Sequence, residues 1–194
     1  MGHFEYVMVL VSIVVGLAIT HLLTALAAAI HRIRGHGEPI QLDTVYVLWI
    51  IHVLIWLLSF WWWEFKFQEL QVEWTFGLYL FIVAYAIGLF MLAAILVPTQ
   101  MQGVRNSFDY FMAGRKWFFG AQLALLAVDL ADSFLKGWDW GTSSGTLITV
   151  SVLSAACVIG LMGERRSLQL LAVVGALSAN LINQFAVMGV LGLW

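Results

Sequence analysis

The chain has 194 residues, of which 62% are hydrophobic and only 10% are charged, and its mean hydropathy is +0.94. A soluble domain of this size cannot bury so much apolar side chain, so the composition predicts a membrane protein. The formal net charge of −2 provides no basic surface for nucleic acid, and the single cysteine, Cys157, excludes a disulfide framework and a cysteine zinc site.

Runs of about 20 apolar residues predict six membrane-spanning helices. They cover residues 5–30, 44–64, 75–97, 113–135, 145–163 and 168–192. The connections are short, and the two prolines, Pro39 and Pro98, both lie between spans. We therefore predict an all-α, polytopic fold in which residues 1–194 form a single integral-membrane domain. The amphipathic segment 98–112 predicts a short interfacial helix leading into the fourth span.

Lys and Arg are distributed unevenly between the two predicted membrane faces. Seven lie on one face, and only Lys66 and Lys136 lie on the other. Because cytoplasmic loops carry the excess of these residues, both termini are expected outside the cell membrane. We predict a multi-pass protein of a bacterial inner membrane, with both termini in the periplasm. Of the consecutive Trp61, Trp62 and Trp63, one is expected to point into the bundle, since neighbouring helical residues face different directions.

A short internal similarity suggests duplication. Residues 4–8 resemble residues 108–112 at an offset of 104, and the same offset aligns Gly16 with Gly120. A three-helix unit repeated once would give the 3+3 inverted arrangement that many transporters have. Asp129 and Asp132 have no counterparts at this offset.

Two histidines lie deep within the first two spans. His21 lies nine residues before Ile30 and His52 eight residues after Thr44, so both are roughly 12 to 14 Å from the same membrane face at 1.5 Å rise per residue. An ionisable side chain at this depth is a candidate for a ligand, proton-relay or cofactor role. The alternative is a structural hydrogen bond to a neighbouring helix.

Small residues recur every four positions in the first span, at Gly16, Thr20, Thr24 and Ala28. Such a stripe allows the backbone of another helix to approach closely. We therefore predict a helix-packing face, with His21 on its flank.

A second polar cluster is expected in the outer halves of the fourth and sixth spans. Its main members are Asp129, Asp132, Asn180, Asn183 and Gln184; the fifth span adds Ser151 and Ser154, and the outer ends of the first two spans add Glu5, Ser12 and Glu64. Their spacings place neighbours on common helix faces, and their depths below the outer surface, roughly 10 to 14 Å for the deeper members, are similar. A carboxylate among amides can hold a proton or a cation, or it can belong to a satisfied network that fixes the helices. Asp132 lies nearer the interface and is expected to be hydrated.

The chain lacks the motifs GxxxxGK[ST], GxGxxG, HExxH and GxSxG, so neither a nucleotide ligand nor an enzymatic activity is favoured. Two polar clusters at different depths predict a path through the bundle. Our first hypothesis is a small inner-membrane channel or transporter for an ion or small solute, with proton coupling and no cofactor.

Two alternatives remain open. One is a redox protein that binds haem b or quinone between the first two spans, with His21 and His52 as the haem ligands. The other is a non-catalytic membrane subunit or effector, in which the small-residue stripe packs against a membrane partner or a second copy of the chain. All three hypotheses place the chain in a lipid bilayer.

Overall fold

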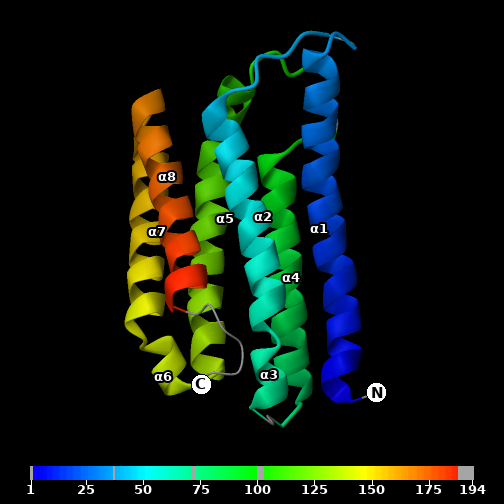
Figure 1. Cartoon of the computed structure of the whole chain (residues 1–194), viewed down its shortest axis with the longest axis vertical. Helices are drawn as coiled ribbons and strands as arrows, with labels where there is room; N and C mark the ends of the chain where they lie inside the picture. Colours follow the sequence, from blue (N-terminus) through cyan, green and yellow to red (C-terminus); the bar gives the residue numbers. More distant parts are fainter. Residues whose placement is uncertain (1, 37, 71–72, 100–102, 188–194) are drawn as a thin grey trace.

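The computed structural model describes residues 2–36, 38–70, 73–99 and 103–187. These residues form helices and connecting turns, with one isolated bridge between Gln41 and Asn106 and no strand. Six helices are long and apolar enough to cross a membrane, which confirms that prediction. They are α1 (His3–Ile33), α2 (Thr44–Trp63), α4 (Phe76–Leu96), α5 (Ser107–Leu135), α7 (Ser144–Met162) and α8 (Arg166–Ile182) (Figure 1). The short helices α3 (Lys66–Glu69) and α6 (Trp138–Gly141) and the π-helical turn η1 (Asn183–Val187) connect or extend them.

One predicted boundary differs clearly from the structure, and another lies outside the described residues. Helix α5 begins at Ser107 rather than at residue 113, because the Asn106 side chain accepts a hydrogen bond from the Phe108 backbone N–H at 2.9 Å and so caps the helix there. The predicted interfacial segment therefore supplies the first turns of α5. Helix α8 ends at Ile182 and continues as η1 to Val187, and residues 188–192 of the predicted sixth span lie outside the described residues.

Polar side chains define the ends of several helices. Asp43, Thr75 and Ser143 each accept a hydrogen bond from a backbone N–H in the first turn of α2, α4 and α7. At the α7–α8 turn, the buried Gln169 amide donates to the backbone carbonyls of Gly160 and Gly163, at 2.8 and 2.6 Å. These bonds satisfy terminal backbone groups that lipid could not solvate.

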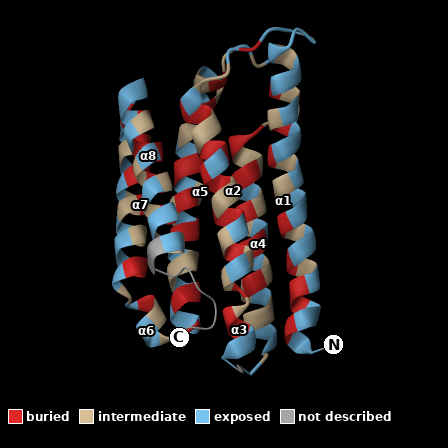
Figure 2. Ribbon diagram, viewed as in Figure 1, coloured by how far each residue is buried: buried red, intermediate tan, exposed pale blue. Residues whose placement is uncertain are grey.

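Helix α2 is central in the bundle, with α1, α4, α5 and α8 packed against it. In the most apolar segment of the span that contains α2, 50% of the residues are buried. The corresponding segments of the other five spans have 33% to 39% of their residues buried. Figure 2 shows buried residues concentrated along α2, α4 and α5, whereas the outer faces of α1 and α7 are exposed. A side chain on α2 can therefore reach most of the other helices.

Helix α1 packs mainly against α4, and its buried residues recur at heptad-like spacing, among them Val11, Ala18 and Leu22. The predicted small-residue stripe lies elsewhere on the same helix. Gly16, Thr20 and Thr24 are exposed, and Ala28 is half-buried. No atom of the described residues lies within 4 Å of a Cβ placed on Gly16, so no other described helix approaches the stripe closely at this position.

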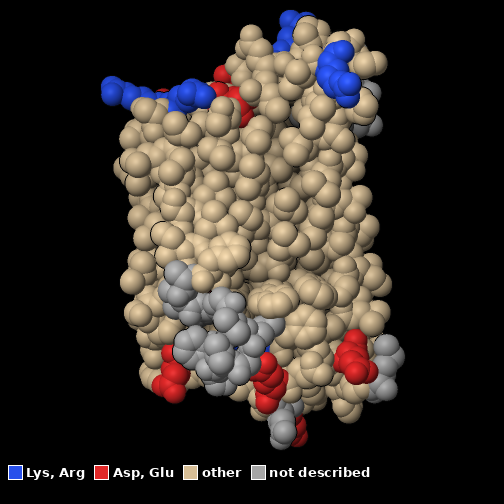
Figure 3. Space-filling model, viewed as in Figure 1, with Lys and Arg blue, Asp and Glu red and all other residues tan. Residues whose placement is uncertain are grey.

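The two ends of the bundle differ in charge (Figure 3). We call the end that holds the turn after α1 the basic end; Arg34, Arg105, Arg165 and Arg166 are exposed there. The opposite end, which holds α3 and α6, is here called the acidic end, and Glu5, Glu69 and Asp139 are exposed there. Lys66 and Lys136, the two cations that we predicted at this face, lie at this end, and both are buried.

The helix neighbours in the two halves of the chain are not equivalent. In the first half, α1 and α4 form one of the most extensive helix pairs, but the corresponding pair in an inverted repeat, α5 and α8, makes at most minor contact. In the second half, α7 packs closely along α8 and α5. The inverted repeat therefore remains a prediction from the short sequence similarity.

Candidate functional site

A polar cavity of about 70 Å³ lies in the acidic half of the bundle, between α2, α4, α5, α7 and α8. Its lining includes the side chains of five predicted site residues: Asp129, Asp132, Asn180, Asn183 and Gln184. Glu64, Tyr85 and Lys136 also line it. The structure thus brings the fourth- and sixth-span members of the predicted outer cluster, together with Glu64, to one cavity, but the other predicted members do not line it. A cavity of this size has room for several water molecules or for one small charged group.

One wall of the cavity is a buried ion triad. The Lys136 ammonium contacts Glu64 Oε1 at 2.9 Å and also pairs with Asp132, and all three side chains are at most 6% exposed. Lys136 Nζ lies 5.1 Å from the centre of the Phe67 ring, which closes the acidic side of the triad. Asp132 is therefore buried, and our expectation that it is hydrated was wrong, because Lys136 one turn later on α5 supplies its counter-charge.

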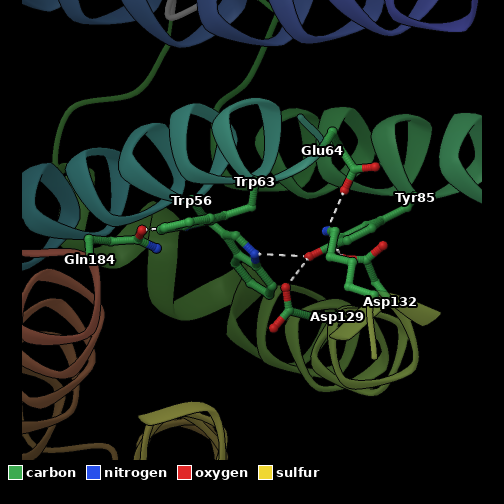
Figure 4. A network of polar contacts seen from close by, with 8 residues as sticks. Trp56, Trp63, Glu64, Tyr85, Asp129, Asp132 and Gln184 are labelled. Carbon is green, nitrogen blue, oxygen red and sulfur yellow. Dashed lines mark hydrogen bonds and ion pairs between the residues drawn. The ribbon is translucent and has the colours of Figure 1, made fainter. Parts of the chain in front are cut away.

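Asp129 has a different environment, with a neutral partner. The Tyr85 hydroxyl on α4 donates a hydrogen bond to Asp129 Oδ1 at 2.6 Å and accepts one from Trp56 Nε1 on α2 at 3.2 Å (Figure 4). No Lys or Arg in the described part of the chain forms an ion pair with Asp129. Its carboxylate is thus oriented by Tyr85 but not neutralised.

The amides of α8 and η1 form the third wall. Gln184 accepts a hydrogen bond from Trp63 Nε1 and donates one to Asn180 Oδ1 at 3.3 Å. The Asn183 side-chain oxygen is buried and has no hydrogen-bond partner among the described residues. Trp63 also confirms that one of the three consecutive tryptophans points into the bundle, whereas Trp62 is 46% exposed.

The charges around the cavity do not balance. Three carboxylates, Glu64, Asp129 and Asp132, face one ammonium, Lys136, so the fully ionised cluster carries a net charge of −2. Glu64 Oε2 and Asp132 Oδ1 are buried without a hydrogen-bond partner in the described residues. Since uncompensated charge in an apolar interior costs several kcal/mol, this arrangement favours the uptake of a proton or a cation.

The two histidines have different partners. His52 on α2 is fully buried, and its Nε2 lies 3.2 Å from the Gln122 amide on α5. His21 on α1 is half-buried, and its Nε2 lies 3.0 Å from the backbone carbonyl of Val97, at the end of α4. Each Nε2 is therefore engaged with a separate helix. No group of three metal-binding side chains is close enough to hold a metal in the residues that the structure describes.

Sequence reasoning missed the roles of Tyr85 and Trp56. Both lie in continuous apolar runs, where a tyrosine or tryptophan is indistinguishable from a packing residue until its neighbours are known. A hydroxyl in the middle of a span was the available signal, because a buried tyrosine hydroxyl needs a hydrogen-bond partner. Glu64 and Lys136 could be recognised as charged residues at the predicted ends of the second and fourth spans. Their burial could not be predicted, because it depends on how α3 and α6 pack over them.

Comparison of the chain with protein-family models, with curated proteins and with solved structures finds no match.

Proposed function

We propose that the chain is a small proton-linked transporter or channel for an ion or small solute, placed in a bacterial inner membrane with both termini outside. The observation that carries the proposal is Asp129, a carboxylate that lines an internal cavity and has no cationic partner within the described residues. A carboxylate at membrane depth can exchange a proton for a cation, which is the elementary step of proton-linked transport. The excess of negative charge at the cavity supports a cationic substrate.

The geometry suggests how the site works. Lys136 neutralises part of the charge of Glu64 and Asp132, while Tyr85 holds the Asp129 carboxylate in place with a hydrogen bond. Asp129 is then the group that binds and releases the transported cation or a proton. The acidic end would face the periplasm, because the exposed arginines at the opposite end match the excess of positive charge of cytoplasmic loops.

Trp56 lies between the cavity and the deeper histidine. Its indole N–H donates to Tyr85, and its ring lies 6.0 Å from the ring of His52, one helical turn earlier on α2. Trp56 is only 5% exposed, and its ring lies between the Tyr85–Asp129 pair and His52. Rotation of the Trp56 side chain would connect Asp129 with the His52–Gln122 pair, which would then be the next group to accept a proton.

Proton flux into proteoliposomes, followed with an internal pH-sensitive dye under an imposed gradient, tests this proposal. D129N keeps the shape of the side chain and accepts the same hydrogen bond, but it cannot carry a negative charge. We expect it to reduce flux at least about tenfold, since charge-assisted contacts are roughly twice as strong as neutral ones. H52Q replaces the imidazole with an amide that can still hydrogen-bond to Gln122, and it is expected to reduce flux less.

D139N is the matched control, because Asp139 is exposed on α6 outside the cavity. It should leave flux unchanged. Equal flux in D129N and D139N, with both proteins monodisperse in detergent, would contradict the assignment of Asp129 as the binding group.

One observation favours the alternative of a non-catalytic subunit. Gly16, Thr20 and Thr24 are exposed, and no described residue lies close to a Cβ placed on Gly16, so the stripe is available to a second helix in the bilayer. Mass measurement of the detergent-solubilised wild type and of T20L tests this reading. A wild-type oligomer that T20L dissociates would support it, and a monomer in both cases would exclude self-association through this face.

A further inference from the structure

An apolar groove on the side of the bundle adjoins the polar cavity. It lies between α2 and the end of α8, has a volume of about 390 Å³, and is lined by Ile55, Leu58, Trp62, Leu181 and Phe185 together with three residues that also line the cavity. These shared residues are Ser59, Trp63 and Gln184. Leu58, Trp62 and Phe185 are 53%, 46% and 80% exposed, so the groove belongs to the lateral surface of the bundle.

Two of the three shared residues are joined by a hydrogen bond. Trp63 Nε1 on α2 donates to Gln184 Oε1 on η1 at the boundary between groove and cavity (Figure 4). The Trp63 ring also packs against the Trp140 ring, with centroids 5.5 Å apart. Breaking the Trp63–Gln184 bond would join an apolar space to a polar space that contains unpartnered carboxylate oxygens.

The cavity already contains the chemistry of a bound alkylammonium. The Lys136 side chain is a hydrocarbon stem ending in an ammonium, and that ammonium pairs with Glu64 and Asp132. A second ammonium, that of Lys66, lies 5.6 Å from the centre of the Trp140 ring, so an aromatic face at the cavity also accepts a cation. Asp129 remains as the carboxylate without an ammonium partner in the described residues.

We propose that the site takes amphiphilic primary ammonium compounds that enter laterally from the bilayer, with the ammonium at Asp129 and the hydrocarbon chain in the groove between α2 and α8. This inference rests on the proposed function and names its substrate class. The head group is selected by the excess carboxylates, and the chain by the apolar lining of the groove. The Trp63–Gln184 bond acts as the gate between them.

Protection of Asp129 from a hydrophobic carbodiimide tests the proposal on the full chain in lipid nanodiscs. Dicyclohexylcarbodiimide modifies carboxyl groups in apolar sites, and mass spectrometry locates the adduct. The competitors are octylammonium, methylammonium with the same head group, and octanol with the same chain. We expect octylammonium to protect at a concentration at least about tenfold lower than methylammonium, because each buried methylene favours binding several-fold. Octanol should not protect.

Two bulky variants distinguish the groove from general partition into lipid. S59F places a ring at the opening between groove and cavity, and S151F places the same ring on the exposed face of α7. S59F should remove the advantage of octylammonium over methylammonium, and S151F should retain it. Q184L removes the gate bond without adding a ring and should accelerate carbodiimide modification of Asp129, which gives a second readout if S59F does not fold.

Equal protection by octylammonium and methylammonium, or equal behaviour of S59F and S151F, would overturn the inference. Proton flux in proteoliposomes separates this result from a failure of the proposed function. Flux that depends on Asp129 without preferential octylammonium protection would leave transport standing and remove this substrate class. Preferential protection without flux would support the binding site and contradict transport.

Discussion

The acidic and basic halves of this bundle both place polar groups among helices that are long and apolar enough to span a membrane, but they do so in opposite ways. In the acidic half, four ionisable side chains surround a cavity of about 70 Å³. In the basic half, His52 pairs with the neutral Gln122 amide, among the rings of Trp49, Phe118 and Phe119. The depth of a polar side chain in the bundle therefore does not by itself indicate a binding role. The space and the charge around the side chain decide whether it can bind and release a ligand.

The aromatic packing explains why the basic half is closed. Trp49 is fully buried, and its ring centroid lies 5.3 and 5.2 Å from those of Phe118 and Phe119. Gly160 on α7 lies directly against Phe119, since a Cβ at that position would come within 2.1 Å of the ring. Such packing resists rearrangement, whereas the acidic half contains unpartnered polar atoms around a cavity.

The largest effect should come from removing the only cation of the triad. K136M leaves Glu64 and Asp132 buried without a counter-charge, and breaking a buried ion pair in this way costs roughly 3–5 kcal/mol. Thermal unfolding in detergent, followed by far-ultraviolet circular dichroism, should show a large decrease in Tm. The triple variant E64Q/D132N/K136M should recover most of the stability, because it removes all three charges together. A Tm for K136M equal to that of wild type would mean that the triad does not stabilise the acidic half of the bundle.

A smaller loss is expected from overpacking the basic half. G160A forces Phe119 to move, and overpacking of this kind costs typically about 1–3 kcal/mol. G16A is the matched control, because nothing lies within 4 Å of a Cβ on Gly16. In the same unfolding assay G160A should lower Tm and G16A should not. If both variants behave alike, the two regions do not differ in packing as the structure indicates.

Loss of the hydroxyl that orients Asp129 should have a moderate effect on stability. Y85F removes the donor to Asp129 and the acceptor for Trp56, so it should cost about 1–3 kcal/mol, the range for buried groups left unsatisfied. Y79F is the control, since Tyr79 is only half-buried on the same helix. The diagnostic result is reduced proton flux in Y85F at a temperature where it remains folded, compared with normal flux in Y79F.

The smallest effect should come from the ion pair between Arg166 and Asp43 at the basic end. Its side chains are 54% and 17% exposed, with Nε and Oδ2 at 2.8 Å, and exposed pairs of this kind contribute about 0–1 kcal/mol. R166Q should therefore change Tm much less than K136M. A comparable decrease in both would show that burial does not account for the difference between the two ion clusters.

The sequence by itself determined that six helices are long and apolar enough to span a membrane, and it determined their approximate limits. These properties depend on the length and apolar content of continuous segments, which need no knowledge of neighbouring helices. The clustering of Asp129 and Asp132 with Asn180, Asn183 and Gln184 could be anticipated for the same reason, since shared depth and local spacing brought them into one hypothesis. The excess of arginine at one end was equally visible.

Only the tertiary structure decided which face of each helix points inward. It directed the small-residue stripe of α1 outward, brought Tyr85 to Asp129, and gave His21 and His52 separate partners. In a soluble protein an apolar stripe reveals the inward face, but here both lipid and the bundle interior are apolar, so the sequence carries little signal for helix rotation. The candidate site depends on that rotation, because it joins side chains from five helices around one cavity.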